Sequence, residues 1–200
     1  MVVVKMYEEF IKLTEDEAKK FNRDAGSVNW PHRKTVSEMI VKGTVLEVGC
    51  GNGIDAHLFN PKTYTGVDVS PALIKSAKEY NPDYYFKIID ATNLPYKMCS
   101  FDNVISIGLF EGQPNIEFAK RIFTEMIRVA KKKVLILWYK APSERYGNVL
   151  QIKKGHFDKT CHDNRYNREE FTELISEFYE FNISHFDENY EIWEIVLNGS

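Results

Sequence analysis

The chain has few cysteines and no long apolar run. Cys50, Cys99 and Cys161 are far apart and form no Cys-x-x-Cys pair, which argues against a disulfide framework and against a zinc knuckle. No segment approaches the roughly 18 apolar residues of a membrane span, and the apolar start MVVVKM is too short for a signal-peptide core. We therefore expect a soluble, cytoplasmic protein without a membrane partner.

An excess of positive charge is also missing. The formal net charge is -3 and the pI is near 6.0, so the chain has no basic field of the kind that a phosphate backbone favours. Nucleic acid is therefore not the expected partner. The 200 residues are 44% hydrophobic and 14% aromatic, which is enough for one substantial core and predicts a single domain.

Strand-like and helix-like patterns alternate through the middle of the chain. Five apolar runs, from TVLEVG (44–49) to KVLILWY (133–139), alternate with helical patterns such as PALIKSAKEY (71–80), and a further helix is expected from about Ile54. Continuous apolar runs are typical of strands that are buried on both faces. The alternation predicts an α/β fold with a doubly wound parallel sheet.

Different patterns precede and follow this core. Two amphipathic helices are expected at the start, one over Tyr7–Phe21 and one after Trp30 that ends before Gly43. Near the end, NREEFTELISEFY reads as a helix, and EFNISHF with YEIWEIVL reads as a β-hairpin. We divide the chain into a helical cap (1–42), a core (43–140), a lid or insertion (141–166) and a C-terminal helix with hairpin (167–200).

Three glycines alternate directly after the first predicted strand. Gly49, Gly51 and Gly53 stand in the sequence VLEVGCGNG (45–53). Glycine lets the chain turn sharply and leaves amide groups uncovered, so that a ligand can approach the main chain. An ordinary tight turn would have the same composition, so the glycines by themselves do not distinguish a binding loop from a connection.

Acidic residues at successive strand ends favour the interpretation that the glycine loop binds a ligand. Asp68 ends the second predicted strand, 19 residues after Gly49 (68 minus 49), and Asp90 ends the third. At that spacing a carboxylate can accept both ribose hydroxyls of a nucleoside. Glu47, Asp68 and Asp90 are therefore expected along one rim of the sheet. Grouped carboxylates repel a pyrophosphate but suit a ligand that carries ammonium and sulfonium charges.

With these motifs the chain resembles the class I S-adenosylmethionine-dependent methyltransferases, especially their small-molecule branch. The segments that carry the resemblance are VLEVGCGNG, YTGVDVSPALIKSAK, DATNLPYKMCSFDNVISIG and EMIRVAKKKVLIL. The resemblance implies a Rossmann-like seven-stranded sheet of order 3-2-1-4-5-7-6, with strand 7 antiparallel, under an N-terminal helical cover. It also implies S-adenosyl-L-methionine as the cofactor.

The resemblance assigns the glycine loop to the methionine portion of that cofactor. Gly49, Cys50, Gly51 and Gly53 would line it, and Glu47 would brace the loop and help to receive the ammonium group.

Further positions would bind the remainder of the cofactor. Asp68 would hold the ribose, Val69 would flank the adenine, and Asp90 with Ala91 would read the adenine edge, while Ile107 would lie beside the cofactor.

The resemblance covers about Lys42 to Tyr139, and the C-terminal hairpin extends it; in similar enzymes the segment before the first strand also has a role. Trp30 and Arg33 stand where similar enzymes close over the cofactor, and Arg33 would pair with the methionine carboxylate, although a surface arginine is an equally good interpretation.

Two departures from the family are visible. The family commonly has a Lys-Pro-Gly-Gly turn before strand 5, whereas here Arg128-Val129-Ala130 runs into Lys131-Lys132-Lys133, which predicts a shorter turn. The branch often has a histidine in a Leu-Glu-His-like stretch after strand 4, and here Gly112 replaces it after Glu111.

The candidates for a general base are Glu111, His156 and His162. His156, Cys161 and His162 also invite a metal interpretation, but their spacing matches no known set of metal ligands, and we expect no metal.

Three functions remain open at this stage. The leading one is methyl transfer to an O, N or S atom of a small-molecule acceptor, because no Asn/Asp-Pro-Pro-Tyr stretch follows strand 4 as in amino-methylating nucleic-acid enzymes. An NAD(P)-dependent oxidoreductase shares the Gly-x-Gly and the acid about 20 residues on, but here the third glycine is at the fifth position. A non-catalytic methyltransferase-like binding protein is the third.

Overall fold

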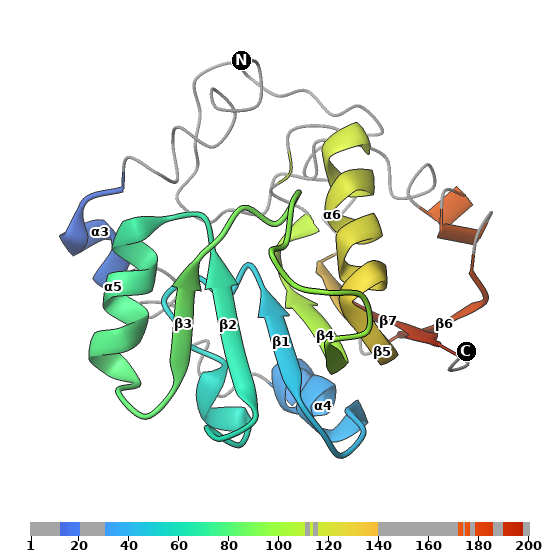
Figure 1. Ribbon diagram of the computed structural model, residues 1–200, viewed down its shortest axis with the longest axis horizontal. Helices are drawn as coiled ribbons and strands as arrows, with labels where there is room; N and C mark the ends of the chain where they lie inside the picture. The colour runs from blue at the N-terminus through green and yellow to red at the C-terminus, as the bar shows by residue number, and fades with distance from the viewer. Residues whose placement is uncertain are drawn as a thin grey trace.

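The apolar runs of the core form neighbouring strands of one sheet. In the computed structural model this sheet has seven strands in the order β3-β2-β1-β4-β5-β7-β6, as predicted, with helices on both faces (Figure 1). The structure describes residues 13–20, 31–110, 113, 116–139, 172–173, 175–176, 179–185 and 190–197. The predicted lid (141–166) lies outside the described residues.

Five strands run parallel and the last two form the predicted hairpin. The parallel strands are β1 (Val45–Val48), β2 (Tyr64–Asp68), β3 (Tyr85–Ile88), β4 (Phe101–Ile107) and β5 (Ala130–Tyr139). β6 (Phe181–His185) and β7 (Tyr190–Val196) pair antiparallel, and β7 also pairs antiparallel with β5. Parallel pairing places the carboxyl ends of β1 to β4 at one edge of the sheet, which we call the carboxyl edge.

Two helices begin at the prolines that the sequence predicts. The continuous helix predicted over Tyr7–Phe21 is wrong, because residues 13 and 14 are not helical and Thr14 caps a helix that starts after it. α5 (Pro71–Tyr80) has Pro71 in its first turn, and the hydroxyl of Ser70 accepts from the amide of Leu73 at 3.4 Å. α4 (Pro31–Met39) likewise begins at a proline, and α3 (Glu15–Lys20) lies against α5. α6 (Ile116–Val129) passes directly into β5 at Ala130, which confirms the shorter turn expected there.

The helix predicted from about Ile54 does not form. The chain makes only the short 3-10 turn η2 (Ala56–Leu58) after the glycine loop. Asn60-Pro61 follows two residues later, and proline disfavours the helical conformation of the residue before it as well as removing its own amide donor. Too few residues lie between Gly53 and Pro61 for a helix of several turns.

Side chains alternate between two layers of core. Leu46, Val104 and Val134 point toward α6, whereas Val45, Ile105 and Leu135 belong to the cluster that also contains Val36 of α4 and Ile74 of α5. The sequence therefore buries both faces of β1, β4 and β5, as their continuous apolar runs predict. Figure 1 shows α6 on one side of the sheet and α4 on the other.

β3 departs from the expectation that all core strands are buried on both faces. It is an edge strand that pairs only with β2 in the order of the sheet. Phe86 is buried, but Tyr85 and Ile88 are 53% and 55% exposed. Burial in the core therefore explains only part of the apolar composition of β3.

A polar contact connects the start of β4 to the segment before β1. The Asp102 carboxylate accepts hydrogen bonds from the amide of Thr44 at 3.0 Å and from its hydroxyl at 3.1 Å, and Lys132 lies 2.7 Å from the other carboxylate oxygen. The hydrogen bond to Lys132 has the largest effect, and together with the hydrogen bonds from Thr44 it lowers the pKa of Asp102 to about 2. A Cβ on Gly43 would lie 2.2 Å from the same carboxylate, so any other residue there would displace the Asp102 side chain.

Within the described residues no helix is both long enough and apolar enough to cross a membrane. The C-terminal helix predicted after Asn167 falls mostly outside those residues, although positions 172, 173, 175 and 176 are helical.

We predict that Asp102→Ala lowers the free energy of unfolding at pH 7 by about 1–3 kcal/mol, because Thr44 and Lys132 lose their common acceptor. The contribution of a carboxylate with a depressed pKa is complete above the unfolded-state pKa near 4, and it disappears as the pH falls through about 2. Urea unfolding at pH 7 and at low pH measures both effects. Asp83→Ala removes an exposed carboxylate and is the control; an equal loss in both variants would contradict the prediction.

Candidate functional site

The glycine loop turns the chain at the carboxyl edge immediately after β1. Gly49, Gly51 and Gly53 have φ angles of 76°, 55° and 70°, in the left-handed region that favours glycine. A Cβ on Gly49 would also lie 2.7 Å from the side chain of Leu109, and one on Gly53 would lie 2.9 Å from the ring of Phe86. Conformation therefore favours glycine at all three positions, and the neighbouring side chains restrict space at Gly49 and Gly53 as well.

Asp68 at the end of β2 binds this loop from the neighbouring strand. Its Oδ2 accepts from the amide of Gly51 at 3.0 Å and its Oδ1 accepts from the amide of Ser70 at 2.9 Å. Burial raises the pKa of Asp68, and the backbone amides oppose that rise. Each carboxylate oxygen can accept a second hydrogen bond, so the side chain keeps acceptor capacity at the edge of the sheet.

Asp90 lies beside Asp68 because β2 and β3 are parallel and in register. Asp68 pairs with Ile88, and the amide of Ile89 donates to the carbonyl of Asp68 at 2.9 Å. Oδ1 of Asp90 accepts from both the amide and the hydroxyl of Thr92 at 2.8 Å. The two predicted acids therefore stand at adjacent strand ends, as the spacing in the sequence indicated.

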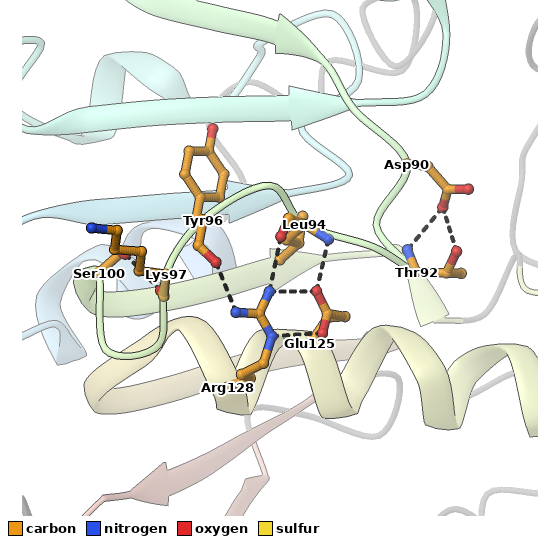
Figure 2. A network of polar contacts seen from close by, with 8 residues as sticks. All are labelled: Asp90, Thr92, Leu94, Tyr96, Lys97, Ser100, Glu125 and Arg128. Atoms are coloured by element: carbon orange, nitrogen blue, oxygen red, sulfur yellow. Dashed lines mark hydrogen bonds and ion pairs between the residues drawn. The ribbon is translucent and has the colours of Figure 1, made fainter.

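An ion pair on α6 supports the segment that follows Asp90. Nε and Nη2 of Arg128 donate to the two carboxylate oxygens of Glu125 at 2.7 and 2.6 Å, and Arg128 also donates to the carbonyls of Leu94 and Tyr96 (Figure 2). The amide of Leu94 in turn donates to Glu125 at 2.7 Å. The hydrogen bonds to Arg128 lower the pKa of Glu125. Sequence reasoning missed this network, because no local pattern connects residues 31 to 34 positions apart.

Glu47 is a residue of β1, and its side chain is buried on the face of the sheet that α4 covers. It is 1% exposed, and its carboxylate accepts a short hydrogen bond from the hydroxyl of Tyr64 on β2. Burial, followed by the charge of Asp55, raises the pKa of Glu47 to about 8, while the hydrogen bond from Tyr64 and the charge of Arg33 lower it. Glu47 therefore has a different environment from the partly exposed carboxylates of Asp68 and Asp90.

Arg33 of α4 forms a buried ion pair with Asp55, which lies two residues after the glycine loop. Asp55 is a site residue that sequence reasoning missed; its signal is a carboxylate in the mostly apolar stretch IDAHLF (54–59). The ion pair connects α4 to the chain just beyond Gly53. The expected contact of Arg33 with a ligand carboxylate stays a prediction.

The remaining predicted residues divide into two groups. Cys50 and Ile107 are buried on the α4 side of the sheet, whereas Val69 and Ala91 are partly buried against the core on the α6 side. Burial raises the pKa of the Cys50 thiol and keeps it protonated. Trp30, Glu111, His156 and His162 lie outside the described residues. Among the residues that are described, no group of three or more His, Cys, Asp or Glu side chains is arranged to hold a metal ion.

With this geometry established, the chain can be compared with known proteins. A family model for a methyltransferase domain matches residues 45–133, which include the glycine loop, Asp68 and Asp90. This segment of the chain is therefore similar to a methyltransferase domain. The matched segment runs from β1 to the start of β5, and the sheet order is the one that the resemblance to the class I methyltransferases implies.

Two curated methyltransferases are similar to part of this chain. The phthiotriol/phenolphthiotriol dimycocerosates methyltransferase of Mycobacterium leprae is 34% identical over 110 residues, which are 52% of this chain and 40% of that protein. A tRNA (carboxymethyluridine(34)-5-O)-methyltransferase of Arabidopsis thaliana is 31% identical over 109 residues, 54% of this chain and 26% of that protein. The chain thus spans less than half the length of either relative.

A solved structure extends the comparison to almost the whole fold. Magnesium protoporphyrin IX methyltransferase from Synechocystis, crystallised with bound S-adenosylmethionine, superposes with a TM-score of 0.65 at 16% identity and covers 98% of this chain and 95% of that one. At this level of identity the superposition establishes the shared fold.

We predict that Arg128→Met destabilises the segment between β3 and β4. Methionine retains an apolar stem but donates no hydrogen bond, so the carbonyls of Leu94 and Tyr96 and the carboxylate of Glu125 lose a partner. The free energy of unfolding should fall by about 1–3 kcal/mol, with faster amide exchange over residues 91–99. Arg121→Met, an exposed position on the same helix, is the control. Similar exchange rates in the two variants would show that Arg128 does not hold this segment.

Proposed function

We propose that the chain is an S-adenosyl-L-methionine-dependent methyltransferase that transfers a methyl group to an O, N or S atom of a small-molecule acceptor. The observation that carries this proposal is the carboxylate of Asp68, which accepts amides from both the glycine loop and the start of α5 at the carboxyl edge. A nucleoside with two adjacent hydroxyls fits acceptors placed in this way. The family and the sheet order support the same proposal.

The described residues fit this cofactor at several points. The oxygens of Asp68 each retain a lone pair for a ribose hydroxyl. Oδ1 of Asp90 accepts both hydrogen bonds from Thr92, and its Oδ2 receives none from the described residues, which suits the exocyclic amine of adenine.

When bound, the cofactor supplies a methyl group on a positively charged sulfur that needs no further activation. The residues of the chain then have to bind and orient the cofactor and the acceptor, and they have to exclude water. Asp68 and Asp90 would orient the nucleoside, while Val69, Ala91 and Ile107 would contribute apolar contacts. Correct alignment of the reacting atoms is worth on the order of 7 to 11 kcal/mol, so no catalytic acid is demanded.

The segments 1–42 and 141–166 complete the site in this proposal. The first would cover the cofactor through Trp30 and Arg33, and the second would enclose the acceptor. Glu111, His156 and His162 remain the proposed bases for an acceptor that loses a proton. A cytoplasmic location is part of the same proposal.

A tRNA acceptor is the second candidate, because the Arabidopsis relative is named as a tRNA methyltransferase. Incubation with isotopically labelled donor and either a metabolite extract or bulk tRNA distinguishes the two acceptors by where the label appears. Label in tRNA alone would reject the small-molecule acceptor.

We predict that the chain binds S-adenosyl-L-methionine and not NADH in isothermal titration calorimetry. Asp68→Ala should weaken donor binding by about 1–3 kcal/mol through the loss of two ribose hydrogen bonds, which is roughly 5- to 150-fold in Kd. Asp102→Ala removes a carboxylate at the opposite edge of the sheet and should leave Kd unchanged when the protein is folded. Unchanged donor affinity in Asp68→Ala would reject the assigned ribose contact, and selective NADH binding would reject the function.

A further inference from the structure

A polar cluster lies within the apolar core beneath the glycine loop. It contains Arg33 of α4, Glu47 of β1, Asp55 of the turn before η2, and Tyr64 of β2, all of them buried. We call these residues the buried charge cluster. Their surroundings are apolar side chains such as Val36, so their charges interact through a medium that screens them weakly.

The buried charge cluster consists of two hydrogen-bonded pairs. Tyr64 donates to Oε2 of Glu47, and Arg33 donates to Oδ2 of Asp55. Oδ1 of Asp55 is buried and has no hydrogen-bond partner among the described residues. Two carboxylates therefore share one guanidinium, and with both carboxylates ionised the cluster has a net charge of -1.

The cluster is close enough to the proposed cofactor site to interact with its charge. Glu47 lies two residues before Gly49, and Asp55 lies two residues after Gly53. Asp68 and Cys50, which belong to the rim and the loop, interact electrostatically with Glu47. A cation bound along the glycine loop would therefore stabilise the ionised cluster.

Without such a cation, burial of a net negative charge is unfavourable, and protonation of one carboxylate removes it. Arg33 compensates the charge of Asp55 directly, which leaves Glu47 as the group that takes the proton. Burial and the charge of Asp55 raise the pKa of Glu47 to about 8. Glu47 is therefore mostly protonated in the ligand-free protein at pH 7.

The donor and the product of the proposed reaction differ in charge. The donor has a sulfonium, an ammonium and a carboxylate, and its net charge is +1. Loss of the methyl group leaves a neutral thioether, so the product has no net charge. Among the bound species, only the donor supplies the extra positive charge that compensates an ionised cluster.

We propose that the buried charge cluster distinguishes donor from product by charge, with Glu47 losing its proton when the donor binds and keeping it when the product binds. This inference rests on the proposed function and deepens it, because it concerns the same site. The O–H bond of Glu47 breaks, the proton passes to solvent, and no bond forms to the ligand. Tyr64 is a positioning residue that stabilises the carboxylate of Glu47.

The pH dependence of binding follows from this proton release. A ligand that favours the ionised form binds more tightly as the pH rises toward the pKa of the free protein. Between pH 6 and 7, below the range in which the amino group of the ligands titrates, donor affinity should rise about tenfold per pH unit. Product affinity should change little, so the ratio of the two Kd values should also change about tenfold.

The groups that face Glu47 are Arg33, Cys50, Asp55, Tyr64 and Asp68. Two ionisable histidines lie on the covering elements: His32 on α4 and His57 in η2.

The test is calorimetric titration of the full chain at pH 7 in two buffers with different ionisation enthalpies. The difference between the apparent enthalpies gives the number of protons released. We expect close to one proton with S-adenosyl-L-methionine and close to none with its demethylated product.

Three variants test whether the released proton comes from the buried charge cluster. Glu47→Gln should abolish the release and make the donor-to-product affinity ratio independent of pH. Tyr64→Phe removes the hydrogen bond that lowers the pKa of Glu47, so it should move the rise in donor affinity to higher pH. His57→Gln should leave the proton count unchanged, and proton release that depends on His57 would overturn the inference.

The remaining outcomes separate this inference from the function on which it rests. Equal proton release with donor and product, or release that survives Glu47→Gln, would overturn the charge discrimination while the methyltransferase proposal stands. Failure of both ligands to bind would overturn both proposals together.

Discussion

The hydrogen bond from the amide of Gly51 to the carboxylate of Asp68 is the contact on which the arrangement of the site depends. It forms because β1 and β2 are parallel neighbours, and because the carbonyl of Val67 accepts the amides of both Gly49 and Cys50 at the turn. The glycine loop is thereby held against the end of β2. β3 extends the same edge, because the amide of Ile89, just after this strand, donates to the carbonyl of Asp68, and Asp90 is the next residue in the chain.

Two polar networks support this edge from opposite faces of the sheet. On the α6 side, Arg128 and Glu125 bind the segment after Asp90 through its main chain. On the α4 side, the buried charge cluster lies beneath the glycine loop. The first network is a partly exposed ion pair that organises backbone, whereas the second is buried and holds one carboxylate in excess. The two faces therefore support the rim by different physical means.

The sequence was sufficient to predict the features that depend on local spacing. The glycines at positions 49, 51 and 53, and the acids at positions 68 and 90, have simple conformational or strand-end reasons, and the structure places them together. The sheet order came from the resemblance to a family, because alternation of strands and helices is compatible with several orders. The helix expected from Ile54 does not form, because Pro61 restricts the residue before it and leaves room for only the short turn η2.

The contacts that sequence reasoning missed join residues far apart in the chain. Arg33 and Asp55 are 22 positions apart, and Arg128 reaches carbonyls 32 and 34 positions away. A charged residue in an apolar stretch signals that a partner exists, but it does not identify the partner. The identity of the partner depends on how helices pack on the sheet, which is settled only in three dimensions.

The brevity of η2 has an electrostatic consequence for the kind of ligand that the loop accepts. A long helix that begins behind a glycine-rich turn directs its macrodipole at the ligand and contributes about half a positive charge, which favours phosphate groups. Here the chain after the loop makes only the three-residue turn Ala56–Leu58. The loop therefore lacks the aligned peptide dipoles that a pyrophosphate would use. The carboxylates of Glu47, Asp55 and Asp68 next to it outnumber the guanidinium of Arg33, so the local field favours cationic ligands.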